Sequence, residues 1–279
     1  MRQIKSEQIS SAVSKLCHQA NISLPDDIFF ALQKAAKNES GAAKSILEDI
    51  IKNAEIAKKE DIPLCQDTGM ANFFVKIGKE VFIEDGDIYS AINQGAAESY
   101  KNNYLRKSIV SDPIIRKNTG DNTPANIYID IVEGSQIEIV FMPKGGGSSN
   151  ASILKMLSPA ESWTGVENFV LNAVKEKGRN ACPPLILGIG IGGDFESIGL
   201  LAKKSLLREI GSKNPNNFYA QKEDDLLNKI NALGIGAMGL GGKTTALAVF
   251  INTKATHIAS LPVAISFQCH SSRRAKITL

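Results

Sequence analysis

Apolar and polar positions follow one spacing in the first quarter of the chain and another spacing after it. Through residues 46–54, apolar side chains recur every three or four positions, which places them on one face of a helix. Residues 23–27 combine a proline with two acidic residues, a composition that favours the start of a helix. We therefore expect residues 6–60 to be helical, with Pro63 ending the helical region.

Beyond Pro63 the pattern predicts strands and helices in mixed order. Apolar runs predict strands over residues 71–77, 185–189 and 246–251. Helical periodicity and caps predict helices over residues 87–104, 159–177, 196–210 and 224–232. Residues 127–131 and 137–141 alternate apolar and polar side chains around Gly134, which predicts a β-hairpin.

Together these elements predict a mixed α/β (α+β) fold formed by a single domain, residues 1–279. Its helical N-terminal lobe would be residues 1–60. The body, residues 61–279, would be a mixed β-sheet flanked by helices.

Composition excludes several classes of protein. The 279 residues are 43% hydrophobic and 22% charged, which is typical of a soluble globular protein. A net charge of +3 and only 6% aromatic residues argue against a nucleic-acid partner. The sequence has no apolar run long enough for a membrane span and no secretory h-region, so we expect no membrane partner and a cytoplasmic location. The four cysteines are then expected to be reduced thiols or metal ligands.

Two glycine-rich segments resemble nucleotide-binding motifs. The glycines of residues 234–242 precede Lys243 and Thr244, as in a phosphate loop, but an extended run follows where that motif needs a helix. Residues 188–193 match GxGxxG after a strand, yet no second parallel strand ending in an acidic residue follows. We interpret these glycines as positions of close packing, or of close approach to a small ligand.

Three of the four cysteines lie in turns. Cys65, Cys182 and Cys269 have polar, proline or glycine neighbours, whereas Cys17 falls in an amphipathic helix and is expected to be a small buried hydrophobic residue. Their wide spacing differs from that of zinc knuckles and ferredoxins, and by itself it leaves three buried thiols as an alternative. Three thiolates around a cubane cluster would leave one iron open to act as a Lewis acid.

Seven segments, in chain order, resemble the class I (iron–sulfur) fumarate hydratase family and in particular its α subunit, a pattern shared with L(+)-tartrate dehydratase. They are IPLCQDTGM, LRKSIVSDP, RKNTGDNTPA, MPKGGGSSNAS, NACPPLILGIGIGG, GIGAMGLGGKTTALAV and LPVAISFQCHSSRRA. The resemblance runs from about residue 10 to Leu279. It implies that Cys65, Cys182 and Cys269 hold a [4Fe–4S] cluster with one open iron.

The resemblance also implies roles for other residues. By matching position, Asp67 and His257 are catalytic, and Arg106 is the arginine whose fork of N–H groups suits a carboxylate. The implied substrate contacts are Gln66, Asp67, Arg106, Gly145, Gly146, Gly147 and His257. Lys243 and Thr244 match the family without an assigned role. Ser149 and Asp194 depart from its pattern.

The implied function is the α subunit of an iron–sulfur hydro-lyase of the tricarboxylic acid cycle, which reversibly hydrates fumarate to (S)-malate. A separate β subunit is expected to supply the rest of the active site, including the catalytic base. One alternative is the α subunit of L(+)-tartrate dehydratase, which converts tartrate to oxaloacetate. Another is a non-enzymatic cluster-binding module, which would explain the thiols but not Gln66, Asp67 and Arg106.

Overall fold

The computed structural model describes residues 1–279 as two compact units. Unit 1 consists of Met1–Pro25, Ala54–Gly146 and Arg273–Leu279, and unit 2 of Asp26–Asn53 and Gly147–Ser272. Three helices form where the sequence predicts them, α1 (Ser6–Ile22), α2 (Asp26–Asn38) and α3 (Gly41–Glu60). α1 belongs to unit 1, α2 to unit 2, and α3 contains residues of both units.

Unit 1 is built on a four-stranded sheet in the order β10–β5–β2–β4. Its strands are β2 (Asn72–Gly78), β4 (Asn126–Val132), β5 (Ile137–Phe141) and β10 (Ala275–Thr278). Helices α1 and α4 (Ile88–Asn102) bury their apolar faces with one face of this sheet, in a core that includes Phe73, Ile139 and Tyr100. A small parallel pair, β1 (Arg2–Lys5) and β3 (Val81–Glu84), completes the unit.

The predicted hairpin of residues 127–141 is wrong. Strand β2 lies between the two predicted arms, parallel to β4 and antiparallel to β5. At the end of β2 the backbone bonds to the connection between β4 and β5, since Gly78 donates to Gln136 (N···O 2.8 Å) and Glu80 to Gly134 (3.1 Å). Alternating side chains fix which face of a strand is apolar but not its partner, so an earlier strand can insert between two consecutive ones.

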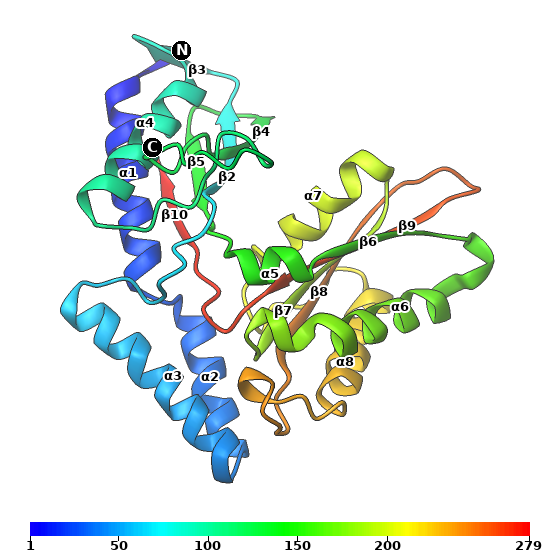
Figure 1. Ribbon diagram of the computed structural model, residues 1–279. Helices are drawn as coiled ribbons and strands as arrows, with labels where there is room; N and C mark the ends of the chain where they lie inside the picture. The colour runs from blue at the N-terminus through cyan, green and yellow to red at the C-terminus, as the bar shows by residue number, and fades with distance from the viewer. The chain divides into compact units, whose positions relative to one another are not determined.

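Unit 2 has helices on both faces of a sheet in the order β6–β9–β7–β8. Its strands are β6 (Ile153–Leu157), β7 (Leu185–Gly192), β8 (Ala246–Lys254) and β9 (Leu261–Gln268). Helices α6 (Ser162–Lys177) and α8 (Asn217–Asn231) share a core with one face, and α7 (Phe195–Ser205) packs on the other (Figure 1). A short helix, α5 (Gly146–Ala151), precedes β6.

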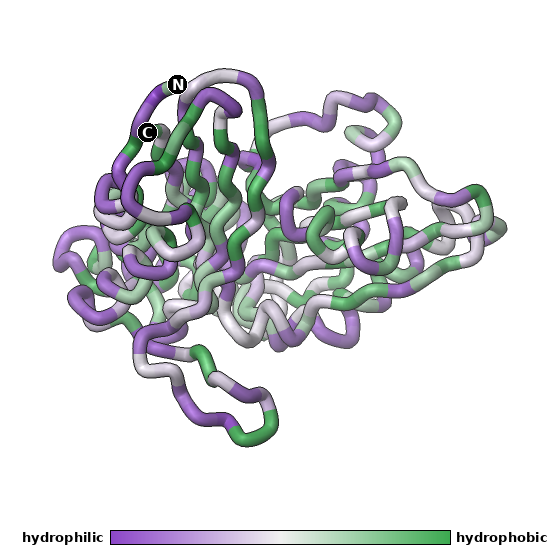
Figure 2. The backbone as a smooth tube through the Cα atoms, turned by 90° about the horizontal axis from the view of Figure 1, so that it is seen from above, coloured by the Kyte–Doolittle hydropathy of each residue, from purple (hydrophilic) through white to green (hydrophobic).

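Buried apolar strands form the interior of unit 2. Every residue of β7 is buried, and in Figure 2 many of the loops carry hydrophilic residues. The mixed sheets of the two units, with their flanking helices, confirm the predicted mixed α/β class. None of the helices combines the length and the apolar character that a membrane crossing needs.

The glycines of the GxGxxG match serve close packing. Gly188 and Gly190 lie inside β7, under α7, where a side chain at Gly188 would overlap the Ala202 carbonyl and one at Gly190 would lie 2.9 Å from the Ala202 nitrogen. A dinucleotide loop places its glycines after the strand, at the start of a helix. Here Gly188 and Gly190 are strand residues that let α7 approach the sheet, and only Gly193 follows the strand.

We expect Gly188→Ala to lower the stability of the chain by about 1–3 kcal/mol, because the added methyl group displaces α7. Gly199→Ala is the matched control, since Gly199 lies on α7 with open space where the new Cβ would be. Alanine is the better helix former, so this control should gain about 0.5–1 kcal/mol. Thermal unfolding of the two variants measures both effects, and equal midpoints would contradict the packing role.

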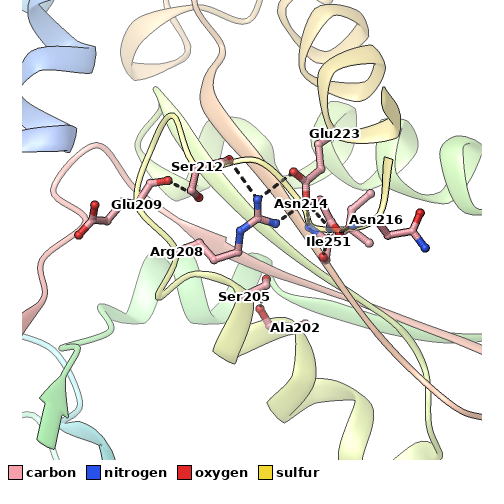
Figure 3. Close-up of polar contacts among 9 residues, drawn as sticks. All are labelled: Ala202, Ser205, Arg208, Glu209, Ser212, Asn214, Asn216, Glu223 and Ile251. Carbon is pink, nitrogen blue, oxygen red and sulfur yellow. Dashed lines mark hydrogen bonds and ion pairs between the residues drawn. The ribbon is translucent and has the colours of Figure 1, made fainter. Parts of the chain in front are cut away.

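A buried ion pair fixes the connection between α7 and α8 on β8 (Figure 3). Arg208 donates two N–H bonds to the Glu223 carboxylate, at 2.5 and 3.1 Å, and a third to the Ser212 carbonyl. Glu223 also accepts from the backbone N–H of Ile251 (2.7 Å) and from Asn214. The carboxylate thus accepts from three residues, two in the α7–α8 connection and one in β8.

Candidate functional site

The turn that carries Cys65 lies in unit 1, between α3 and β2, and its acidic side chain is held by backbone donors. The Asp67 carboxylate accepts from the N–H of Gly69 through Oδ1 (3.0 Å) and from the N–H of Gly146 through Oδ2 (2.7 Å). Cys65 and Asp67 are half-buried and Gln66 is exposed. The carboxylate therefore has a fixed orientation while the turn remains accessible.

Buried side chains brace the backbone of the same turn by donating hydrogen bonds to its carbonyl groups. The Tyr100 hydroxyl donates to the carbonyls of Thr68 (2.8 Å) and Gly69 (3.1 Å), and the Asn122 amide also donates to Gly69 (3.1 Å). Burial raises the pKa of the Tyr100 phenol, so the hydroxyl stays protonated and can donate. A third brace is Arg273, which donates to the Asp67 carbonyl (2.9 Å).

Arg106 lies beside this turn. Its guanidinium donates to the Gln66 side-chain oxygen (3.3 Å), and its carbonyl accepts from the Thr68 hydroxyl (3.1 Å). Arg106 is exposed and has no carboxylate partner. An arginine in this state keeps N–H groups available for an incoming carboxylate. The structure thus collects Cys65, Gln66, Asp67 and Arg106 on one part of unit 1.

The second glycine-rich loop meets the Asp67 carboxylate. A side chain at Gly145 would place its Cβ 3.0 Å from Asp67 Oδ2, whereas one at Gly146 would lie 3.8 Å away, at ordinary contact distance. Gly145 therefore has a steric requirement that Gly146 lacks. What Gly146 supplies is its backbone N–H.

In unit 2, Cys182 and Cys269 lie next to the paired ends of two neighbouring strands. β7 starts just after Cys182, β9 ends just before Cys269, and the two strands are paired antiparallel neighbours. His270 closes this end of the sheet, because its backbone N–H (3.1 Å) and its ring Nδ1 (3.0 Å) both contact the Cys182 carbonyl. Cys182 is exposed and in the left-handed conformation (φ 53°), and Cys269 is half-buried.

Two glycine segments of unit 2 also lie at this end of the sheet. A side chain on Gly147 would approach the Asn180 carbonyl to 3.1 Å, and the neighbouring Ser148 hydroxyl donates to Gln268 (3.3 Å). In the segment of residues 234–242, the Met238 N–H donates to the Pro183 carbonyl (2.7 Å). The segment folds against the loop that carries Cys182, and β8 rather than a helix follows it. A phosphate loop is therefore excluded.

His257 lies at the other end of the same sheet. It follows β8, whose last residue pairs with Gly192, and the adjacent Thr256 hydroxyl donates to the Gly193 carbonyl (2.7 Å). Strand β7 separates this end from Cys182 by about 23 Å, at 3.3 Å per residue. Within unit 2, His257 therefore lies at the end of the sheet opposite to Cys182 and Cys269.

Asp194 and Ser149, which depart from the family pattern, accept local hydrogen bonds. Asp194 caps α7 by accepting from the Ser197 N–H (2.8 Å), and hydrogen bonds from the Ser197 side chain and backbone lower the pKa of Asp194. It lies at the His257 end of the sheet, so it makes no contact with Cys182. Ser149 is exposed, and its carbonyl accepts from the Ser152 N–H.

The candidate cofactor ligands are the three turn cysteines. No disulfide forms, and Cys17 is fully buried in the core of unit 1, where burial raises the pKa of its thiol. Cys65 belongs to unit 1, and Cys182 and Cys269 belong to unit 2. No group of three histidine, cysteine, aspartate or glutamate side chains is arranged to hold a single metal ion. The donor set itself, three reduced thiols at turns, is the chemistry that iron–sulfur clusters use.

Sequence reasoning missed the braces of the Cys65 turn, which are Tyr100, Asn122 and Arg273. Two of them fall inside segments that the analysis singled out, since Asn122 lies in RKNTGDNTPA and Arg273 in LPVAISFQCHSSRRA. Tyr100 has no local signal, because its position among helical residues 87–104 indicates only a core side chain.

Comparison with known proteins identifies the class. The fumarate hydratase (Fumerase) family model matches residues 10–278. A protein of Methanocaldococcus jannaschii, provisionally named L(+)-tartrate dehydratase subunit alpha, is 45% identical over 275 residues, 96% of this chain and 96% of the relative. L(+)-tartrate dehydratase subunit alpha of Escherichia coli K12 is 33% identical over 271 residues, 96% of this chain and 89% of the relative.

These matches, together with the cysteine-bearing turns, place the chain among the hydro-lyases. The chain belongs to the Fumerase family, as its seven motifs predicted.

Proposed function

We propose that the chain is the α subunit of an iron–sulfur hydro-lyase that adds water to fumarate and removes it from (S)-malate. The observation that carries the proposal is the Cys65 turn, where a fixed carboxylate, an arginine without a carboxylate partner and a thiol lie together. Membership of the family supports the reaction class. A non-enzymatic cluster module would need the thiols but neither Asp67 nor Arg106.

Cys65, Cys182 and Cys269 would hold the [4Fe–4S] cluster. Their reduced state, their positions in turns and the exclusion of Cys17 by burial support this assignment. When bound, the cluster supplies a Lewis-acidic iron that makes hydroxide a better leaving group.

The residues of this chain bind and orient the substrate. Arg106 forms a two-point contact with one carboxylate, beside Gln66. The loop of Gly145, Gly146 and Gly147 contributes its backbone to the substrate site. Asp67, held by two backbone N–H groups, gives or takes the proton at the hydroxyl oxygen. The role of His257 stays a prediction from the family motif, since His257 and Cys182 lie at opposite ends of the sheet of unit 2.

The proposal includes a partner subunit. The relatives named above are alpha subunits, and no base for the carbon proton is assigned on this chain. A β subunit would supply that base and further contacts to the dicarboxylate. This chain without the partner should show little turnover.

The test is anaerobic reconstitution of the full chain with iron and sulfide, with and without its partner subunit, followed by assays of fumarate, (S)-malate and L(+)-tartrate. The proposal predicts about four irons for each chain and turnover only with the partner. Full turnover by this chain alone, or no bound iron, would refute it. A cluster whose EPR spectrum is unchanged by all three acids would favour the non-enzymatic module.

L(+)-tartrate is the second candidate substrate, because the names of the relatives favour it. The two activities differ in one substrate hydroxyl, and a site that hydrogen-bonds a hydroxyl rejects the analogue lacking it by about 10⁴-fold or more. The ratio of kcat/KM for malate and tartrate on the reconstituted pair therefore decides between them.

We expect Gly145→Ala to lower kcat about tenfold, because the methyl group displaces the Asp67 carboxylate by a few tenths of an ångström and misplaced catalytic groups lose rate steeply. Gly146→Ala keeps the N–H that Asp67 accepts and has room for the methyl group, so it should stay within about twofold on the same argument. Equal kcat values for the two variants would show that Asp67 needs no fixed position.

A further inference from the structure

Arg273 is a buried arginine directly behind the Cys65 turn. Its side chain belongs to the last segment of unit 1 and is only 2% exposed. One terminal nitrogen donates to the Asn21 side-chain oxygen (2.9 Å) and the other to the Asp67 carbonyl (2.9 Å). The guanidinium therefore touches the backbone of the residue that carries the proposed acid.

The charge of Arg273 is not neutralised by a bonded anion. Both of its acceptors are neutral, no carboxylate forms an ion pair with it, and its Nε has no hydrogen-bond partner. A cation buried in this way is costly, and proteins ordinarily place a carboxylate against it. Asn21 stands where an aspartate of the same shape would do so.

Asn21 is itself held in one orientation. Its amide nitrogen donates to the Cys17 carbonyl (2.8 Å) in α1, which turns its oxygen toward Arg273. Arg273 is thus anchored to α1 on one side and to the turn on the other. Among the three braces of the turn, Arg273 is the charged one, while Tyr100 and Asn122 are neutral donors.

We propose that Arg273 is a positioning residue that holds the Cys65–Asp67 turn through the Asp67 carbonyl, and whose unneutralised charge favours a dianionic substrate at that turn. The inference rests on the proposed function for the identity of the anion. Its structural half, the positioning of the turn, concerns this chain alone. A net positive charge next to a binding site raises the local concentration of anions and their affinity for the site.

Three variants separate the two contributions. Arg273→Met removes the charge and the carbonyl bond, and Arg273→Lys keeps the charge without the fork. Asn21→Asp gives Arg273 the missing carboxylate and gives up the bond to the Cys17 carbonyl. Lys276→Met is the matched control, because it removes one positive charge from an exposed position on β10, where Lys276 pairs with Glu138. The chain is measured reconstituted with its partner subunit and, separately, without cluster.

For Arg273→Met we expect hydrogen exchange of the turn amides, residues 65–69, to rise at least tenfold in the cluster-free chain, together with an increase in the KM for the dicarboxylate of about tenfold. Arg273→Lys should restore KM to within about threefold of wild type, since it keeps the charge. Asn21→Asp should raise KM about tenfold with kcat within about twofold, while the exchange of the turn stays near that of wild type. Lys276→Met should change neither quantity.

A purely structural role would appear as a lower unfolding midpoint in Arg273→Met with unchanged KM in every variant, and it would overturn the electrostatic half. Unchanged exchange in Arg273→Met would overturn the positioning half. If Arg273→Met does not fold, Asn21→Asp and Arg273→Lys still decide the matter. Wild-type protein that binds no iron and no dicarboxylate would refute the proposed function instead, and the exchange comparison would remain valid.

Discussion

Replacing Cys65 with serine should abolish iron binding and lower kcat/KM by about 10³-fold or more. Removing a Lewis acid that contributes several kcal/mol costs that much, at about 1.36 kcal/mol for each tenfold change in rate. The serine is close in size, so the half-buried turn should keep its shape. Iron and sulfide analysis of the purified, anaerobically reconstituted chain measures the first effect, and steady-state kinetics with the partner subunit measures the second.

Cys182→Ser and Cys269→Ser should behave in the same way, and Cys17→Ala is the control. Cys17 is fully buried against α4 and the sheet of unit 1, and burial raises the pKa of its thiol, which keeps it protonated. Its replacement should lower stability modestly and leave the iron content unchanged. A Cys65→Ser chain that still binds four irons would remove Cys65 from the ligand set.

Glu223→Ala should destabilise the chain by about 3–5 kcal/mol, because it leaves the largely buried Arg208 charge without its carboxylate and the Ile251 N–H without its acceptor. Arg208 and Glu223 are 19% and 8% exposed in their side chains, and the carboxylate also accepts the Ile251 N–H of β8 (Figure 3). The unfolding midpoint should fall by roughly 10 °C. Differential scanning calorimetry of the purified chain measures it.

Two further variants test the reason. Glu48→Ala removes an exposed pair with Lys44 on α3 and should cost less than about 0.5 kcal/mol. The double variant Arg208→Met/Glu223→Leu removes both charges and should recover part of the loss, since an apolar pair needs no counter-ion. A midpoint for Glu223→Ala equal to that of Glu48→Ala would show that the pair contributes nothing.

Local pattern predicted most of the elements. The helices of residues 6–60, the strand of residues 71–77 and the buried strand that begins at Leu185 all formed where periodicity placed them. Their periodicity survives in the fold because each element buries one face, or both, against a neighbour. The family was confirmed for the same reason, since its motifs are local strings of residues.

The same short stretches of sequence did not predict which strands pair or where individual motif residues lie in the fold. The hairpin prediction failed because β2 inserts between β4 and β5, and alternation carries no information about partners. The glycines of residues 188–193 matched a nucleotide motif by letters, and only the position of Gly188 and Gly190 inside β7, under α7, shows that these two serve packing. The place of His257 depends on the length and direction of β8, which motif matching ignores.

The sequence by itself determined the class of fold, the family and the three turns that carry Cys65, Cys182 and Cys269, because all of these follow from local composition and order. Only the tertiary structure decided how the Cys65 turn is held, because Tyr100, Asn122 and Arg273 come from distant segments and meet it through packing. It also decided that Arg273 bonds to neutral acceptors, one of them an asparagine in α1 that is far away in the sequence. Long-range contacts of this kind are set by the burial of whole faces, and no short stretch of residues encodes them.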